Sequence, residues 1–392
     1  MRTIGTKIYG VRAPIIRPND DLVEIVTDSI LRAVEEEKLT LKEKDIVAVT
    51  EAVVAKAENN YASLSDITED IKSKITNDTL GLIFPILSRN RFSSILKAIS
   101  RSCKNLVIQL SYPFDEVGNP LLTYEQLDEK DINPYTDEFE EEEFRSIFND
   151  IRHPFTHIDY VEYYKSIAPN AKIIFSNNPL TILKYTDNVI NADIHTRNRT
   201  KNKLLKNNAK VVLSLSDILT QPVNNSGYHP LYGVLGSNAS SDEVVKLFPR
   251  DSQKFVEELQ LNIYKKTKVL VECMVYGDGA FKDPVGGIWE LADPVVSPGH
   301  TNGLIGLPNE LKLKYIADDK LVNLSKEEAL AEIKKMIKEK EANMSQTDKA
   351  LGTTPRKITD LLGSLCDLTT GSGDKGTPIV LIKGYFDNMS DE

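Results

Sequence analysis

Strand and helix signals alternate most densely in residues 171–217, which read AKIIFSNNPLTILKYTDNVINADIHTRNRTKNKLLKNNAKVVLSLSD. Short apolar runs bounded by turn residues predict buried strands, and Pro179 suits the first turn of a short helix between two of them. This order predicts βαβ packing with right-handed crossovers, and therefore an α/β fold. We expect strands at 172–175, 188–194 and 211–215, and helices at 179–185 and 199–207.

A mixture of helix and strand signals extends over the rest of the chain. Asp20 and Asp21 precede apolar residues at helical spacing, which predicts a helix over 22–31. Ser325 and Glu328 form a capping-box pattern ahead of an amphipathic run. Further helices are expected at 63–101 with a break near 84–85, at 242–267 with a bend at 249, at 325–341 and at 355–367; strands are expected at 45–50, 106–110, 268–275 and 379–382, and an element of either type at 51–58.

The composition excludes several classes of protein. With 392 residues, 41% of them hydrophobic and 27% charged, the chain has room for two or three ordinary domains. A formal net charge of −10 argues against a nucleic-acid partner, and the sequence has neither an apolar signal-peptide segment nor a membrane-length apolar run. Cys103, Cys273 and Cys366 lack metal-binding spacing and favour a reducing compartment. We therefore expect a cytoplasmic protein.

A loop rich in glycine and acidic residues, within residues 272–306, is the first candidate site. Its centre reads YGDGAFKDPVGGIWELADP and follows an apolar strand. Carboxylates are the oxygen ligands that Mg²⁺ and Mn²⁺ prefer, and glycines let the backbone approach a ligand closely. We take Asp278, Asp283 and Glu290 as candidate metal ligands. The alternative is a surface loop that uses Asp and Gly only to form turns.

Two further segments have features of anion sites. The loop 371–376 (GSGDKG) precedes a strand and could bind an anion through backbone N–H groups and a lysine, but its residues favour a plain turn. His195, Arg197 and Arg199 lie where a strand leads into a helix, a position suited to phosphate or carboxylate. The alternative for these three is a solvated basic helix start.

Several segments, in this order, resemble the coenzyme F420 gamma-glutamyl ligase family. The segments AKAE after an apolar strand and GTPIVLIKG near the end are the most specific. The resemblance covers about residues 1–100 and 205–392, so the predicted organisation is a ligase-like domain in two parts, 1–102 and 206–392, with an inserted α/β region at 103–205. The matching segments are 13–22 (APIIRPNDDL), 45–50 (DIVAVT), 55–58 (AKAE), 233–238 (GVLGSN), the strand before 277–279 (GDG), and 373–384 (GDKGTPIVLIKG).

The resemblance implies a mixed α/β fold that forms an intertwined homodimer. It also implies a ligase that uses GTP, or ATP, with Mg²⁺ or Mn²⁺. In such an enzyme a small-molecule carboxylate is phosphorylated, and the amine of glutamate or a similar substrate then attacks the acyl phosphate. The positions that match the family's nucleotide contacts are Pro14, Ile15, Ile16, Lys56, Asn238, Gly371, Gly373, Lys375 and Gly376.

The chain departs from the family pattern at its metal ligands. Leu235 stands where the family has a metal-binding aspartate, and Tyr276 or a neighbour stands where it has another. Ser372 replaces an acidic residue of the final glycine-rich loop. Leucine cannot coordinate a hard cation. The sequence therefore leaves two hypotheses: a ligase whose metal site is rebuilt from nearby acids, or a non-catalytic nucleotide- or metabolite-binding protein of the same fold.

Overall fold

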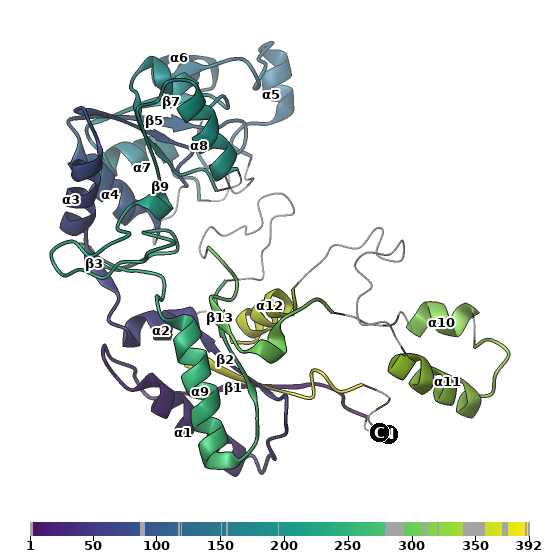
Figure 1. Cartoon of the computed structure of the whole chain (residues 1–392). Coiled ribbons are helices and arrows are strands. Elements are labelled where there is room, and N and C mark those ends of the chain that lie inside the picture. The colour runs from purple at the N-terminus through teal and green to yellow at the C-terminus, as the bar shows by residue number, and fades with distance from the viewer. Residues whose placement is uncertain are drawn as a thin grey trace. The chain divides into compact units, whose positions relative to one another are not determined.

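The structure is a computed structural model, and it divides into two compact units, which we describe separately (Figure 1). The terminal unit contains Met1–Val54, Asp251–Ala280 and Val296–Glu392, and the central unit contains Ala55–Arg250 and Phe281–Val295. The residues that the structure describes are 3–86, 91–116, 118, 120–149, 151–153, 156–194, 196–278, 294–308, 311, 313–319, 321–339, 357–370, 375–388 and 390.

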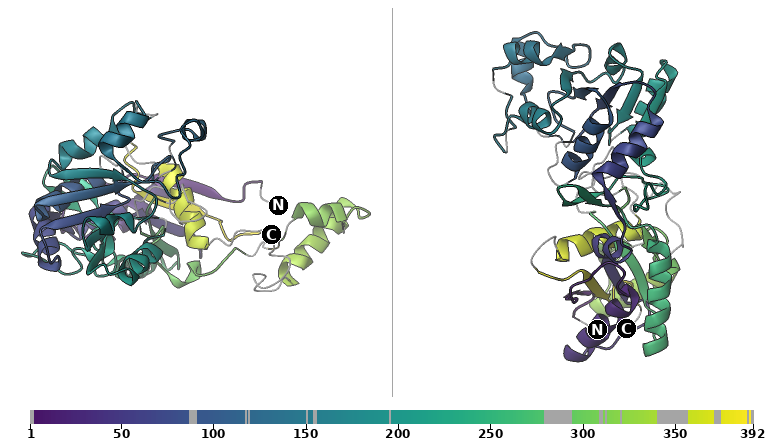
Figure 2. Two further views of the ribbon diagram at one scale, coloured as in Figure 1. Left: turned by 90° about the horizontal axis from the view of Figure 1, so that it is seen from above. Right: turned by 90° about the vertical axis from the view of Figure 1, so that its left-hand side faces the viewer.

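The terminal unit is built on a five-stranded sheet with helices on both faces (Figure 2). Alternating residues of the strands pack against α12 (Ile358–Thr370) on one face, where Leu362 and Cys366 are fully buried. Helix α9 (Ser252–Thr267) packs against the sheet and against α1 (Leu22–Glu36). The strands, in sheet order, are β1 (Lys7–Val11), β14 (Ile379–Lys383), β2 (Ile46–Thr50), β12 (Glu272–Tyr276) and β13 (Gly299–His300).

The central unit has a six-stranded sheet in which five strands are parallel. Helices α3 (Leu64–Lys74), α4 (Phe92–Ser102) and α7 (Tyr160–Ile167) contribute to the larger core on one face, and α8 (Arg197–Lys206) contributes Leu204 to the core on the other. The strands, in sheet order, are β6 (Phe139–Glu140), β7 (Ala171–Phe175), β5 (Asn105–Leu110), β4 (Thr79–Ile83), β8 (Asn188–Asn191) and β9 (Val211–Ser214). The chain starts at the central β4, runs outward through β5 and β7, and returns to β8 on the opposite side, which is a doubly wound topology.

A small antiparallel sheet and several short helices complete the described elements. The small sheet has the order β10 (Asn238–Ser241), β11 (Val244–Lys246) and β3 (Tyr61–Ser63). The remaining helices are α2 (Glu51–Ala57), α5 (Tyr124–Glu129), α6 (Glu141–Ile147), α10 (Leu313–Asp319), α11 (Lys326–Glu339), and the 3-10 helices η1 (Thr181–Lys184), η2 (Leu215–Asp217) and η3 (Asn302–Leu304).

The predicted mixed α/β fold is confirmed, and two element assignments are wrong. The span 63–101 contains strand β4 between two helices, and 242–267 contains β11 before its helix begins at Ser252. A short apolar run such as 79–83 (TLGLI), buried within a sheet, has no periodicity that separates it from a helix. The six-stranded sheet contains strands from 103–205 and also the strands at 79–83 and 211–214. The compact unit that holds this sheet therefore includes more residues than the predicted insert. That 103–205 is an insertion within the family stays a prediction.

The environments of the three cysteines predict a slow thiol reaction. Burial raises the pKa of Cys103 to about 11, and it raises the pKa of Cys273 and Cys366 further still. Since the thiolate is the reactive species, the native chain is expected to react slowly with a disulfide reagent at neutral pH. Titration in denaturant should then reveal all three thiols quickly. Fast reaction of one thiol in the native protein would show that its surroundings are more open than described.

Candidate functional site

One edge of the terminal unit's sheet collects the ends of four strands. Strands β1, β2 and β12 run in the same direction, and β14 runs against its neighbours β1 and β2. The pairing register aligns Val11, Ile379, Val49 and Val275 in one row across the sheet. The chain therefore leaves β1, β2 and β12, and enters β14, at the same edge.

Segments that match the family's nucleotide contacts lie at this edge. Pro14, Ile15 and Ile16 follow β1; the side chain of Ile16 is buried, whereas Ile15 is 83% exposed. Lys375 and Gly376 precede β14, and the Lys375 ammonium donates a hydrogen bond to the Thr369 carbonyl, 3.3 Å away. Gly376 has a φ of +65°, a conformation that favours glycine. The edge thus brings together an exposed apolar side chain, a lysine and a glycine turn.

The segment between Gly376 and β14 packs closely against β1 on one side and β2 on the other. A Cβ atom added to Gly10 would lie 3.3 Å from the side chain of Thr377, and the Thr50 N–H donates to the Pro378 carbonyl at 3.0 Å. Glycine at position 10 therefore lets the segment before β14 pack against β1. These contacts fix the path of the chain between Gly376 and β14.

Asp278 also lies at this edge, two residues after β12. The preceding Gly277 N–H donates to the Val296 carbonyl at 2.9 Å, which anchors the start of the acidic loop. The other two candidate metal ligands, Asp283 and Glu290, lie outside the described residues, as do Gly371 and Gly373. Across the residues that are described, no group of three or more His, Cys, Asp or Glu side chains is placed to hold a metal ion.

Lys56 and Asn238 belong to the central unit and are described within it. Lys56 lies in the last turn of α2 and is half-buried. Two residues on, the Glu58 carboxylate accepts a hydrogen bond from the Arg250 N–H at 2.7 Å, so the AKAE segment is tied to the chain that follows β11. Asn238 begins β10 and pairs with Lys246.

The start of α8 is occupied by a carboxylate of the chain itself. Asp193 accepts hydrogen bonds from the N–H and hydroxyl of Thr196, at 2.9 and 2.8 Å, and from the hydroxyl of Thr200 at 2.5 Å. Burial lowers the pKa of Arg197, and the charge of Asp193 opposes that shift. Arg199 is exposed, and His195 lies outside the described residues. Any external anion at this helix start would have to compete with Asp193.

A sequence model of the F420-0:gamma-glutamyl ligase family matches residues 10–384, nearly the whole chain. The chain belongs to this family. Its members are ligases that form gamma-glutamyl bonds on small-molecule substrates. No curated protein matches the chain. Within the described part of this ligase-family protein, no helix has both the length and the apolar character needed to cross a membrane.

Leu235 and Tyr276, which stand at or next to positions where the resemblance implies metal-binding aspartates, have buried side chains. Leu235 is buried in the large core of the central unit. Tyr276 is 2% exposed, and its hydroxyl forms a hydrogen bond of 2.9 Å with the hydroxyl of Thr370. Both side chains therefore serve packing, and neither fits a metal-binding aspartate position of the kind that the family resemblance implies.

Proposed function

We propose that this chain is a nucleotide-dependent ligase that joins glutamate, or a similar amine, to the carboxylate of a small molecule. The observation that supports the proposal is the shared sheet edge: segments matching the family's nucleotide contacts follow β1 and precede β14 at one edge, and Asp278 follows β12 there. These segments are far apart in the sequence and come together only through the register of the strands.

The proposed reaction has two steps. A carboxylate oxygen of the acceptor attacks the terminal phosphorus of GTP or ATP, and the nucleoside diphosphate leaves. The amine then attacks the carbonyl carbon of the acyl phosphate, inorganic phosphate leaves, and the nitrogen loses a proton. Activation is needed because a carboxylate does not itself react with an amine in water, and phosphate is the better leaving group.

The chain's own residues would bind and orient the nucleotide. In the central unit, Lys56 provides a compact positive charge of the kind that binds phosphate oxygens. In the terminal unit, the backbone around Gly376 can approach a ligand closely. The exposed Ile15 offers an apolar surface for the base. Asn238 provides an amide that can both donate and accept hydrogen bonds.

A divalent cation would lower the charge repulsion between the nucleotide and the carboxylate. Asp278 lies at the sheet edge, and with Asp283 and Glu290 it makes up the proposed ligand set. The proposal also includes a homodimer in the cytoplasm, which light scattering and cell fractionation can test.

The burial of Leu235 and Tyr276 favours a second candidate function. In this alternative, the chain is a non-catalytic nucleotide- or metabolite-binding protein that has kept the fold and lost the metal site. The ligase requires the nucleotide and the metal together, whereas the binding protein does not require the metal.

A thermal-shift screen with GTP and ATP, each with and without Mg²⁺ or Mn²⁺, tests the proposal. The ligase is expected to melt higher with GTP or ATP, and the rise should depend on the metal, because a ligand that binds only the folded state stabilises it. A rise in melting temperature that is the same with and without the metal would favour the binding protein. The absence of a shift with either nucleotide would contradict the ligase and would leave the non-catalytic binding protein as the favoured function.

A further inference from the structure

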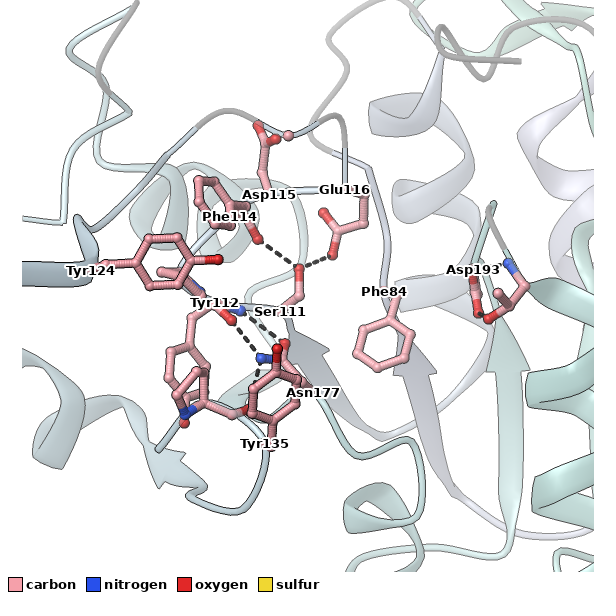
Figure 3. Close-up of a pocket in the computed structure, with 14 residues that line it drawn as sticks. Phe84, Ser111, Tyr112, Phe114, Asp115, Glu116, Tyr124, Tyr135, Asn177 and Asp193 are labelled. Atoms are coloured by element: carbon pink, nitrogen blue, oxygen red, sulfur yellow. Dashed lines mark hydrogen bonds between the residues drawn. The ribbon is translucent and has the colours of Figure 1, made fainter. Parts of the chain in front are cut away.

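The central unit has a cavity of about 430 Å³ at the carboxyl ends of its parallel strands (Figure 3). This volume lies within the range of small-molecule sites, about 300–1,000 Å³. Strands β4 and β8 are the neighbours between which the doubly wound chain reverses its direction, and ligands of open α/β sheets bind in the crevice at this switch point. The lining includes residues from the loop after each of four strands: Phe84 after β4, residues 111–116 after β5, Asn177 after β7, and Asp193 after β8.

The carboxylates in the lining have partners within the chain. Asp193 accepts three hydrogen bonds at the start of α8. Glu116 accepts one from the Ser111 hydroxyl at 2.8 Å, and a carboxylate oxygen of Asp115 lies 3.5 Å from His153 Nε2. The described lining contains no lysine or arginine. A charged ligand would therefore lack a free group of opposite charge, which favours an uncharged ligand.

Five aromatic rings line the cavity. Tyr124 is 58% exposed and Tyr135 is 87% exposed, and the ring of Phe114 meets that of Tyr124 edge to face, with centroids 5.5 Å apart. Exposed apolar side chains that gather in one place mark binding sites. A flat aromatic ligand would cover these rings and gain the attraction between aromatic rings. The five rings are those of Phe84, Tyr112, Phe114, Tyr124 and Tyr135.

Phe84 has a backbone conformation that a bulky residue rarely adopts. Its φ is +51°, in the left-handed region, although it directly precedes Pro85, which favours an extended conformation. The Phe84 N–H donates to the Gln109 carbonyl at 3.0 Å, which fixes the turn after β4. Strained residues of this kind persist where their surroundings fix them, and they cluster at ligand sites. The strain therefore supports a ligand site at the switch point.

Hydrogen bonds hold the opposite part of the lining in place without a ligand. The Asn177 side chain accepts from the Tyr112 N–H at 3.1 Å and donates to the carbonyls of Tyr112 and Pro134 at 2.5 and 2.9 Å. Pro134 directly precedes Tyr135, so these bonds also position the backbone that carries the most exposed ring. A lining fixed in this way loses little entropy when a ligand binds.

A second, smaller cavity borders the large one, since Ser111, Asp115 and Glu116 line both. Its volume of about 10 Å³ suits a single oxygen atom the size of a water molecule. Tyr160 lines it and is 4% exposed, and its hydroxyl has no hydrogen-bond partner among the described residues. Burial raises the pKa of Tyr160, so the hydroxyl keeps its proton and can donate. A buried donor of this kind costs free energy unless an acceptor fills the space beside it.

We propose that this cavity binds an uncharged aromatic compound of one or two flat rings that carries a hydroxyl or carbonyl oxygen. The rings of the ligand would lie against Tyr124 and Tyr135, and its oxygen would accept a hydrogen bond from Tyr160. The described lining contains none of the positions that match the family's nucleotide contacts. The proposed binding therefore does not depend on the ligase function.

Calorimetry on the full chain with two matched probes tests the preference for aromatic rings. 2-Naphthol and decahydro-2-naphthol share one carbon skeleton and one hydroxyl, both are uncharged at about pH 7, and only the first has flat aromatic rings. 2-Naphthol is expected to bind at least about tenfold more tightly, because it stacks on two rings of the lining. Equal or tighter binding of decahydro-2-naphthol, or no binding of 2-naphthol, would overturn the proposal.

Tyr135→Leu and Tyr124→Leu keep an apolar side chain and remove the ring. Each is expected to weaken 2-naphthol binding about two- to tenfold and to change decahydro-2-naphthol binding less. Tyr264→Leu, at a tyrosine 44% exposed on α9, is the matched control and should change neither. All three side chains are exposed, so the variants are expected to fold. Unchanged 2-naphthol binding in both Tyr135→Leu and Tyr124→Leu would place the ligand elsewhere and overturn the proposal.

Tyr160→Phe removes only the buried hydroxyl. It is expected to weaken 2-naphthol binding about two- to tenfold, the effect of one lost hydrogen bond. The melting temperature without ligand should not fall, because the hydroxyl has no partner within the described part of the chain to lose. Unchanged 2-naphthol binding in Tyr160→Phe would show that the hydroxyl donates only to water, and would overturn the proposed position of the ligand's oxygen.

Discussion

Asp45→Ala is expected to lower the free energy of unfolding by about 3–5 kcal/mol, the cost of leaving a buried charge without its partner. Asp45 and Lys383 form an ion pair of 2.5 Å between the start of β2 and the end of β14, with side chains only 3% and 14% exposed. Asp45 also accepts hydrogen bonds from the N–H groups of Lys42 and Gly384, at 2.8 and 3.3 Å. The substitution would therefore leave the buried Lys383 ammonium without its carboxylate partner at the end of β14. Denaturant unfolding followed by circular dichroism measures the loss.

A matched control and a double variant separate the charge from the loss of packing. Asp78→Ala breaks another ion pair of 2.5 Å, Lys104–Asp78, whose side chains are 76% and 66% exposed, and should cost less than about 1 kcal/mol. Asp45→Asn with Lys383→Met removes both charges and should recover much of the stability lost in Asp45→Ala. Equal losses in Asp45→Ala and Asp78→Ala would contradict a stabilising role for the buried pair.

Lys56→Ala is expected to weaken nucleotide binding about 10- to 100-fold, since a hydrogen bond to a charged group contributes about 1.5–3 kcal/mol. The side chain is half-buried in the last turn of α2, where its flexible stem leaves the ammonium able to reach a phosphate. Calorimetric titration with GTP in the presence of Mg²⁺ measures the change. The expected effect concerns binding, and the melting temperature without nucleotide should shift only slightly.

Lys72→Ala is the matched control for Lys56→Ala. Lys72 is exposed in the last turn of α3 and lies outside every segment that resembles the family's nucleotide contacts. The control should bind GTP as the unmodified chain does. If Lys56→Ala also bound GTP normally, Lys56 would not be the phosphate contact that the family resemblance implies.

Local sequence signals predicted most of the elements but not how they combine. The apolar run 46–50 and the capping box of Ser325 and Glu328 are local, and both are present as predicted, with the Ser325 N–H donating to Glu328 at 2.9 Å. The row of Val11, Ile379, Val49 and Val275 depends on pairings between strands hundreds of residues apart. No local pattern encodes such a register, so the shared edge could be inferred only from the family resemblance.

The meeting of several loops at the carboxyl ends of the central unit's parallel strands is not predicted by the sequence, for a related reason. The segment 111–120 (SYPFDEVGNP) predicts only a turn-rich loop when it is read alone. Its place in the sheet depends on β4, which the sequence pattern predicts as part of a helical span but which is the first strand of the six-stranded sheet along the chain. Had 79–83 been assigned as a strand, the doubly wound order would have placed Ser111 and Asp193 at one sheet edge.

The ligase proposal is tested most directly by product formation. The unmodified chain is incubated with F420-0, glutamate, GTP and Mg²⁺ or Mn²⁺, and mass spectrometry follows the acceptor while GDP is measured in parallel. The proposal predicts an acceptor that has gained one glutamyl residue for each GDP formed, with little product from Lys56→Ala or without nucleotide. Product that forms equally well without nucleotide, or a chain that neither binds GTP nor modifies the acceptor, would contradict it.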